Sequence, residues 1–198
     1  MCFLVPPAVS YKETFLRGAA DFHAHGQLDS TYAVCLGYNL KSLNRRFARF
    51  VQDLLDLQTP TSPYSTQYRD RVLWLIDGDE YIGQSSVRPD LSSNYLITYG
   101  GHIGYSIRPS KRRRGYGKKI LAATLEQARL MDLKRILITC NSDNTGSRKI
   151  IESNGGRFER DLPMDADCFR AEGRPLQAGL TKLRYWIDLS LDPAPPRP

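Results

Sequence analysis

Residues 112–117 have the sequence Arg-Arg-Arg-Gly-Tyr-Gly and combine three features that suit a bound phosphate group. Gly115 and Gly117 lack a Cβ, so backbone N–H groups can approach an anion closely there. The segment leads into a predicted helix over 115–131, whose first N–H groups are unpaired and carry partial positive charge. The arginines add diffuse positive charge. The motif therefore favours phosphate binding, although a short arginine run is also typical of a solvated loop.

The spacing Arg-x-x-Gly-x-Gly differs from two common nucleotide-binding fingerprints. The chain contains neither Gly-x-Gly-x-x-Gly nor Gly-x-x-x-x-Gly-Lys-Ser/Thr, so a different phosphate loop is needed. The segment resembles the pyrophosphate loop of the GNAT superfamily of acyl-CoA-dependent N-acetyltransferases, Arg/Gln-x-x-Gly-x-Gly/Ala, with Arg112, Gly115 and Gly117 at the matching positions. The resemblance extends over 99–158 and includes Tyr105-Ser106-Ile107-Arg108-Pro109, Asn144-Thr145-Gly146-Ser147 and Gly155-Gly156-Arg157-Phe158.

The resemblance implies an α/β (α+β) GNAT-like fold. Such a fold has a central mixed, mostly antiparallel sheet of about six to seven strands, flanked by about four helices. Its fourth and fifth strands, expected here at 102–108 and 136–140, splay apart. The resemblance also implies acetyl-CoA (coenzyme A) as the cofactor, with the pantetheine arm in the gap between those two strands.

The same resemblance assigns roles to the residues around the loop. The Ile107 N–H would hydrogen-bond the thioester carbonyl and stabilise its developing charge, a contact worth about 3 kcal/mol when pre-organised. Asn144 would meet the pantetheine, although a helix N-cap explains this residue equally well. The cofactor-binding residues expected on this basis are Ser106, Ile107, Arg108, Arg112, Arg113, Arg114, Gly115, Tyr116, Gly117, Lys118, Asn144 and Ser147.

The groups for proton transfer match the family less well. Many GNAT enzymes use a glutamate on the fourth strand, and the matching place falls near Gly101, in a stretch without acids over 96–111. His102 lies beside it and has an ordinary pKa near ~6.5, so it is the expected base or water relay, with packing in the sheet as the alternative. The family's tyrosine acid would stand at Ile151, so Ser147 or a water is expected to replace it.

Neither the cysteines nor the histidines form a pattern typical of a metal site. Cys140 would end a strand near the thioester, but nothing activates it, so direct transfer is expected rather than an acyl-cysteine. His23 and His25 are two residues apart on a predicted helix and face different ways, so we expect no metal. The four cysteines form no Cys-x-x-Cys pair and suit reduced thiols: Cys2, Cys35, Cys140 and Cys168.

Length and composition suit one globular domain. With 198 residues, 41% apolar and 10% aromatic, the chain can build a full core, and no apolar run approaches the ~18 residues of a membrane helix. We expect one domain over 1–190 and an unstructured proline-rich tail over 191–198. The first residues lack the basic and apolar regions of a secretory signal, so a cytoplasmic protein is expected.

The formal net charge of +7 is compatible with nucleic acid, an acidic membrane surface or an anionic cofactor. Its distribution is more informative, because residues 108–119 contain seven Lys or Arg and no acid. This concentration beside the glycine loop favours a phosphorylated cofactor. No RNA-binding motif is present, so neither nucleic acid nor a membrane is expected as a partner.

Hydrophobic spacing and turn signals predict the remaining elements. The expected helices cover 10–25 (with Ser10 as N-cap), 39–58, 115–131 and 145–153. The expected strands cover 71–76, 81–87, 95–99, 102–108, 136–140 and 183–189, the first two joined by a turn at 77–80. The segment 161–179 is expected to be a flap or disordered, and Tyr64 and Tyr68 to border an acceptor pocket.

The leading hypothesis is an N-acetyltransferase that moves acetyl from acetyl-CoA to a primary amine on a small molecule, a peptide terminus or a lysine. A catalytically degenerate acyl-CoA sensor or partner-binding domain is the first alternative, since the family's glutamate and tyrosine are absent. A transferase directed at RNA or aminoacyl-tRNA is the second. Many relatives dimerise, so a homodimer is compatible with the sequence, which leaves the acceptor and the oligomeric state open.

Overall fold

A computed structural model describes residues 1–59, 69–91, 93–173 and 175–190 of the chain. Its strands form two antiparallel sheets, with orders β1-β2-β3-β4 and β5-β7-β6. The strands are β1 Cys2–Val5, β2 Arg71–Asp77, β3 Glu80–Val87, β4 Ile103–Ile107, β5 Arg135–Asn141, β6 Arg157–Pro163 and β7 Thr181–Asp188. The α-helices are α1 Lys12–Ala24, α2 Leu40–Arg45, α3 Phe47–Asp56, α4 Tyr116–Leu130, α5 Thr145–Ser153 and α6 Ala166–Ala171.

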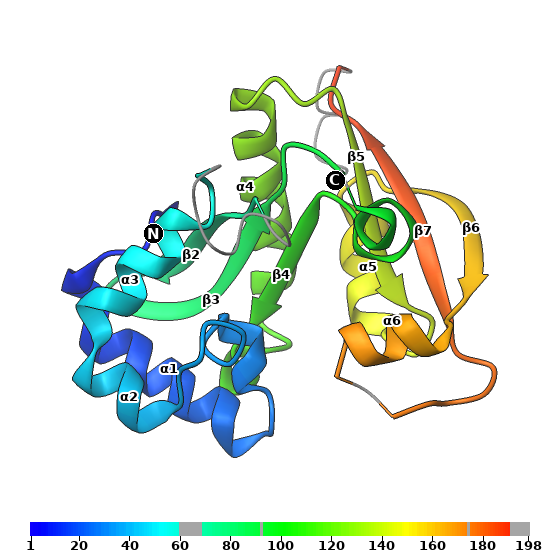
Figure 1. The fold of residues 1–198 in the computed structure, drawn as a ribbon. Coiled ribbons are helices and arrows are strands. Elements are labelled where there is room, and N and C mark those ends of the chain that lie inside the picture. Colours follow the sequence, from blue (N-terminus) through cyan, green and yellow to red (C-terminus); the bar gives the residue numbers. More distant parts are fainter. Residues whose placement is uncertain (60–68, 92, 174, 191–198) are drawn as a thin grey trace.

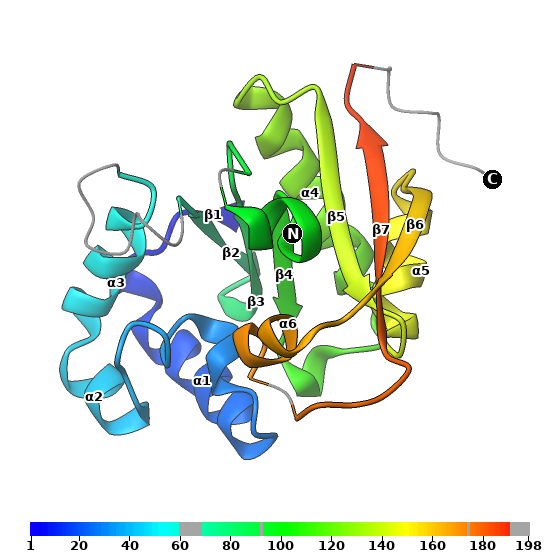
Figure 2. The same cartoon turned by 45° about the vertical axis from the view of Figure 1, so that its right-hand side comes forward.

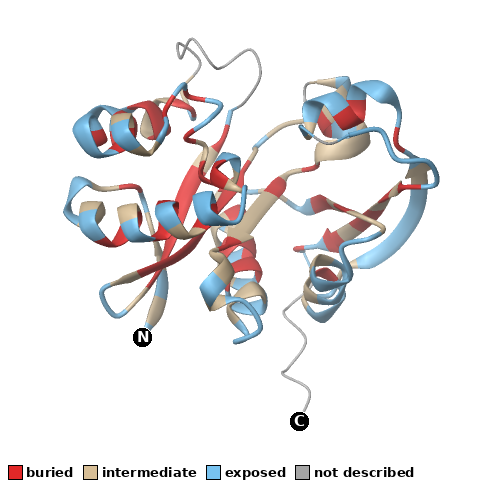
Figure 3. Cartoon of the chain, turned by 90° about the horizontal axis from the view of Figure 1, so that it is seen from below, coloured by how far each residue is buried: buried red, intermediate tan, exposed pale blue. Residues whose placement is uncertain are grey.

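The first sheet is covered by helices on both faces (Figure 1). Successive side chains of β2 point to opposite sides, so its near-continuous apolar run can be buried on both. Trp74 packs with Phe15 of α1 and Phe47 of α3, whereas Leu75 packs with Ile120 of α4. Figure 3 shows the resulting buried centre between helices whose outer faces are exposed.

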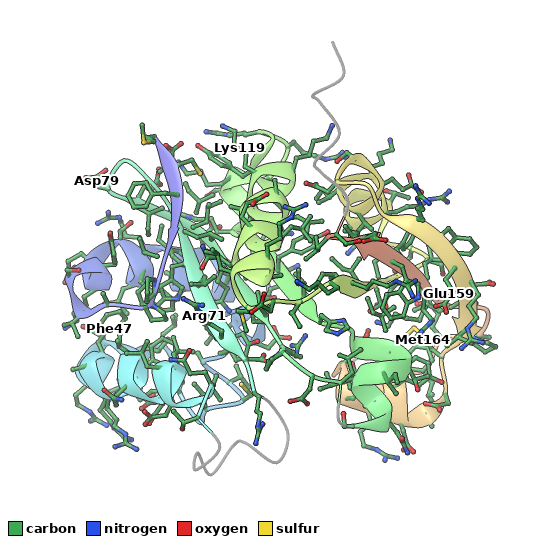
Figure 4. The ribbon with its side chains drawn as sticks, turned by 90° about the horizontal axis from the view of Figure 1, so that it is seen from above. Phe47, Arg71, Asp79, Lys119, Glu159 and Met164 are labelled. Atoms are coloured by element: carbon green, nitrogen blue, oxygen red, sulfur yellow. The ribbon has the colours of Figure 1, made fainter. Side chains whose placement is uncertain are left out.

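The two sheets meet at one end of β4 and β5 and separate toward the other. Among the described residues, a single isolated β-bridge, between Gly101 and Ile138, links the two sheets, while the other edge of β5 pairs with β7 along its whole length. Figures 1 and 2 show the two strands diverging from this point. Figure 4 shows Phe47 in the helical half and Met164 beside α6, with α4 between them. The predicted fold class, with a sheet splayed at this position, is confirmed.

The helix predicted over 39–58 is two helices, which is a correction. The backbone turns at Arg46 (φ −120°), which ends α2 and precedes α3. The guanidinium of Arg46 lies 5.4 Å from the centre of the Tyr38 ring, and the break lets Leu43 and Phe47 both reach the core. The predicted first helix likewise begins later, since Tyr11 rather than Ser10 is its N-cap, after a 3-10 turn at Val9–Tyr11.

The strand predicted over 95–99 is wrong, because Leu96–Gly100 forms a π-helical turn. The Arg184 guanidinium donates hydrogen bonds to the carbonyls of Ile97 and Thr98 at 2.5 and 2.7 Å, and the Thr139 hydroxyl donates to the Tyr99 carbonyl at 2.6 Å. These long-range donors satisfy carbonyls that a neighbouring strand would otherwise pair, so tertiary contacts override the β-type composition.

The segment 161–179 is folded where it is described, rather than a loose flap. It contains the end of β6 and the helix α6, whose Cys168 and Phe169 are buried against Tyr95 and Tyr99. Asp165 caps α6 by accepting a hydrogen bond from the Cys168 N–H at 2.8 Å.

Strand β1 was not predicted, and it pairs with β2 at the edge of the sheet. Tyr64, Tyr68 and the tail 191–198 lie outside the described residues. Within the described ranges, none of the helices has both the length and the apolar character that crossing a bilayer requires.

Candidate active site

A cavity of ≈ 440 Å³ lies where β4 and the second sheet diverge. Its walls come from β4, from the loop before α4, from the start of α5 and from the segment after α1. It brings together many residues that the sequence singled out, from Ser106 on β4 to Ser147 on α5. The lining residues are Gln27, Ser30, Tyr105, Ser106, Ile107, Arg112, Arg113, Gly117, Asn144, Gly146, Ser147 and Ile150.

The loop before α4 presents a row of unpaired backbone donors. Arg113 and Gly115 both have left-handed φ angles, 61° and 80°, which turn successive N–H groups to one side. Among the described residues, no backbone acceptor pairs with the N–H groups of 113–117, whereas Lys118 and Lys119 donate to the Gly115 carbonyl. The loop thus has the geometry of an anion site at a helix N-terminus.

Gly117 allows close packing at this helix start. A Cβ at this position would lie 2.4 Å from the Ile150 Cδ1 of α5, so any larger side chain must displace that neighbour. The requirement for glycine at Gly115 has a different cause, because its φ of 80° disfavours L side chains even though nothing lies within 4 Å of its Cβ position.

Arg108 anchors the loop and does not line the cavity, so its expected role in cofactor binding stays a prediction. Its guanidinium makes ion pairs with Asp21 of α1 and Glu80 of β3, both at 3.0 Å. Asp21 also accepts a hydrogen bond from the Ser110 N–H at 3.1 Å. The charge excess of this segment is therefore partly neutralised within the protein, since Lys111 also pairs with Glu80.

The other basic and aromatic side chains of the loop divide into two groups. Arg113 lines the cavity, and Arg112 lines it while its Nε donates to the Ile107 carbonyl at 2.9 Å. Arg114 and Lys118 line none of the described cavities. Tyr116 points toward the first sheet, where its hydroxyl donates to Asp77 at 2.7 Å.

The free edge of β4 faces the gap. Arg88 donates its N–H to the His102 carbonyl at 2.8 Å, and Arg108 donates to the Ile82 carbonyl at 2.9 Å. Hydrogen-bonded pairs alternate along an antiparallel ladder, so the even-numbered residues of β4 pair with β3. The N–H groups of Tyr105 and Ile107 therefore point away from β3, toward the opening between the sheets.

Ser147 and Tyr105 connect the two sides of the cavity. Their hydroxyl oxygens are 2.7 Å apart, and the Ser147 N–H donates to the Asn144 side chain at 2.9 Å, which caps α5. Burial raises the pKa of Tyr105, so its phenol stays protonated at neutral pH. Tyr105 was not among the site residues expected from the sequence. The available signal was its place on a strand, because a partly buried tyrosine generally needs a partner for its hydroxyl.

The structure places His102, the base expected from the sequence, outside the described cavities, so its role as a base stays a prediction. Its Nδ1 accepts a hydrogen bond from the Leu137 N–H at 2.9 Å, so the ring proton sits on Nε2 and the lone pair on Nδ1 is occupied. Burial lowers the pKa of this ring. The ring joins the two sheets beside the Gly101 bridge.

Two further cavities adjoin the first one at Tyr105, which lines all three. The second, of ≈ 370 Å³, reaches β5, β7 and α6 and includes Glu172 and Lys182. The third, of ≈ 320 Å³, lies against β3 and the turn after α1, and includes Tyr32 and Arg88. A ligand in the first cavity would therefore have room beside it for a second reactant.

Cys140 lines the second cavity but has no features of a nucleophile. The thiol is buried, and burial raises its pKa to about 11, so it is protonated at neutral pH.

Comparison with known proteins places this arrangement in a family. Residues 38–157 match the family model described as an acetyltransferase (GNAT) domain. The fold is similar to that of the microcin C7 self-immunity acetyltransferase MccE, solved with acetyl-CoA and AMP, at 16% identity and a TM-score of 0.63 over 95% of this chain and 92% of that chain.

Two other solved structures show the same likeness of fold. RimJ of Mycobacterium smegmatis, in complex with a CoA disulfide, is 19% identical with a TM-score of 0.62, covering 94% of this chain and 81% of that chain. RimL, described as a ribosomal L7/L12 alpha-N-protein acetyltransferase, is 17% identical with a TM-score of 0.61, covering 96% of this chain and 94% of that chain. No curated protein matched the chain in sequence.

Proposed function

The chain belongs to the GNAT acetyltransferase family, and we propose that it transfers an acetyl group from acetyl-CoA to a primary amine by direct attack. The main support is one observation: Arg113 and Gly117, the two ends of the loop with unpaired N–H groups, line the same cavity as Ile107 on the free edge of β4. The pyrophosphate of CoA needs the unpaired N–H groups, and the amides of its pantetheine arm need the free strand edge. The residues present therefore fit the cofactor.

Acetyl-CoA supplies the acetyl thioester, and the protein positions and polarises it. The N–H groups of 113–117 would hold the pyrophosphate, with the Arg113 guanidinium beside it. The Ile107 N–H, aimed into the gap, would donate to the thioester oxygen as negative charge develops, a contact worth about 3 kcal/mol. The Ser147 hydroxyl, held by Tyr105 and by the cap of α5, would donate a hydrogen bond to the leaving sulfur.

The acceptor is a primary amine on a small molecule, a peptide N-terminus or a lysine. Its entrance would be through the second or third cavity, because both adjoin the first at Tyr105. A peptide terminus merits inclusion in a screen because the fold neighbour RimL is described as an alpha-N-protein acetyltransferase.

A catalytically degenerate acyl-CoA binder is the second candidate, and one observation favours it. Among the described residues, the first cavity has no acid or histidine in its lining, so it contains no obvious base. Such a protein would bind CoA and acetylate nothing.

Calorimetry and mass spectrometry separate the two candidates. The protein is titrated with CoA and then incubated with acetyl-CoA and four amines: serinamide, methioninamide, Nα-acetyllysine amide and spermidine. A transferase is expected to bind CoA and to add one acetyl mass to at least one amine. Binding without any mass gain would support the degenerate binder, and failure to bind CoA at millimolar concentration would contradict both.

A further inference from the structure

Two half-buried side chains, a tyrosine and an arginine, line the third cavity and contact a buried carboxylate behind them. The Tyr32 hydroxyl donates to Asp70 and lies 2.9 Å from the Ser86 hydroxyl. Arg88 Nε lies 2.8 Å from Asp70 Oδ1, and its Nη2 donates to Oδ2 at 3.1 Å. The Asp70 side chain is fully buried, with 0% exposed.

The backbone of Tyr32 has a conformation that residues other than glycine rarely adopt. Its φ of 62° is left-handed, which costs a non-glycine residue about 1–2 kcal/mol. Strained residues of this kind are concentrated at functional sites, where the surrounding structure fixes them. Here the strain places the phenol between Asp70 and the cavity.

The third cavity adjoins the proposed cofactor cavity. Ser30, Tyr105 and Ser106 line both. The Ser106 hydroxyl and the Gln84 amide donate to the Ser30 carbonyl at 3.0 and 2.8 Å, which fixes the turn carrying Tyr32 against β3 and β4. An amine in the third cavity would therefore lie between Tyr32 and the free edge of β4.

A second cluster of the same composition lies elsewhere and provides a matched control. The Tyr38 hydroxyl donates to Asp53 at 2.6 Å, and Arg49 pairs with Asp53 at 2.8 Å. Tyr38 and Asp53 are buried, but they lie in the helical core and line none of the described cavities. Only the Tyr32 cluster faces a space that a reactant could occupy.

We propose that Tyr32 accepts a proton from the acceptor amine in the third cavity and passes its own hydroxyl proton to Asp70. The protonated amine gives one proton to Tyr32 Oη while the Tyr32 hydroxyl proton moves to Asp70 Oδ2, which frees the nitrogen lone pair. The lone pair forms the bond to the acetyl carbon while the carbon–sulfur bond breaks with its electron pair on sulfur, and the second nitrogen proton goes to that sulfur to give the thiol. After the amide leaves, the proton returns through Tyr32 to water. This inference rests on the proposed transferase function.

The relay is tested by comparing the acetylation rates of the variants Tyr32→Phe and Tyr38→Phe. The acceptor is whichever of the four panel amines the wild type acetylates fastest. Loss of a general base typically costs 10²-fold or more, so we expect Y32F to lose about 10²-fold in kcat/KM at pH 7 while its CoA affinity is unchanged. The loss should shrink above pH 9, because solution then deprotonates the amine. The other ionisable groups of the third cavity are Asp29, Cys35, Arg88 and Tyr105, and Asp70 contacts the Tyr32 hydroxyl. Y38F should retain both the rate and the pH profile.

A second readout does not depend on turnover. In apo protein labelled with 13Cζ-tyrosine, the Tyr32 resonance, assigned by its absence in Y32F, should shift when the same amine is added, and the Tyr38 resonance should not. Equal rates for Y32F and wild type, a loss that is the same at every pH, or an unmoved Tyr32 resonance would overturn the relay alone. Wild type that binds CoA but acetylates no panel amine would instead overturn the proposed transferase.

Discussion

The helices α4 and α5 both begin at the first cavity, but their N-termini differ. At α5, the Asn144 side chain accepts a hydrogen bond from the Ser147 N–H at 2.9 Å, so this end is capped by the protein itself. At α4, the N-cap is Gly115, which has no side chain, and the N–H groups of 113–117 have no backbone acceptor among the described residues.

On the proposed function, the start of α4 binds the cofactor and the start of α5 positions a side chain. An uncapped N-terminus leaves donors and a positive dipole end for a ligand anion. A capped one is stable without a ligand and can hold a side chain in place, here the Ser147 hydroxyl against Tyr105. Substitutions at the two helix starts should therefore have different effects on CoA affinity and on stability.

The largest effect is expected at Gly115. Ala at a φ of 80° should distort the row of N–H groups, and losing two charge-assisted hydrogen bonds would weaken CoA binding by about 100-fold. Gly155→Ala is the matched control, because Gly155 has a φ of 84°, an equally open Cβ position and no place in the cavity lining. Calorimetry should show the affinity loss for G115A alone, while both variants lose about 1–2 kcal/mol of stability.

Arg113 and Arg114 test whether the open N-terminus of α4 holds CoA through a placed side chain. Of these two, only Arg113 lines the cavity, so Arg113→Gln should reduce CoA affinity by about 10-fold and reduce its salt dependence. Arg114→Gln removes the same charge from the same loop and should change affinity much less. Equal losses for the two variants would mean that the loop attracts CoA through net charge rather than through a placed guanidinium.

Asn144 tests the capped N-terminus. Asn144→Ala should lower the free energy of unfolding by about 1 kcal/mol and reduce kcat, because Ser147 loses its fixed backbone, while CoA affinity falls only a few-fold. Asn39→Ala is the control, since Asn39 caps α2 in the same way, accepting from the Ser42 N–H at 2.9 Å, far from the cavity. Chemical denaturation should give similar losses of unfolding free energy for both variants, and only N144A should have a lower kcat.

The smallest effect on affinity is expected at Arg108, despite its position in the loop. Arg108→Gln should cost about 1–3 kcal/mol of stability and leave CoA binding nearly unchanged, because the guanidinium makes ion pairs with Asp21 and Glu80. Although burial would raise the pKa of Asp21, hydrogen bonds from Ser110 and Arg108 lower it overall. Its contribution to stability is thus present above the ordinary pKa near ~3.9 and lost as the pH falls below it. Acid denaturation curves should show a weaker loss in R108Q.

The parts of the site that the sequence predicted have local signals. Glycine spacing and helical periodicity indicated the loop and α4, and alternation indicated β4 and β5, all near their expected ranges. The order of these elements also carried the family resemblance, which the match over 38–157 confirms.

The parts that the sequence did not predict depend on contacts between distant residues. His102 has a suitable ordinary pKa, but its ring bonds the backbone of Leu137, which no local pattern reveals. The π-helical turn at Leu96–Gly100 depends on donors from Arg184 and Thr139. The Tyr32 cluster joins three segments through Asp70 and Arg88, so it became visible only in the folded chain.

The most direct test of the open N-terminus is an amide NMR titration of the full chain with CoA. The N–H resonances of 113–117 and of Ile107 are expected to shift saturably and further than that of Ser147, whose N–H is already bonded within the protein. If CoA binds while the 113–117 resonances stay in place, the pyrophosphate lies elsewhere and the account of this site is wrong.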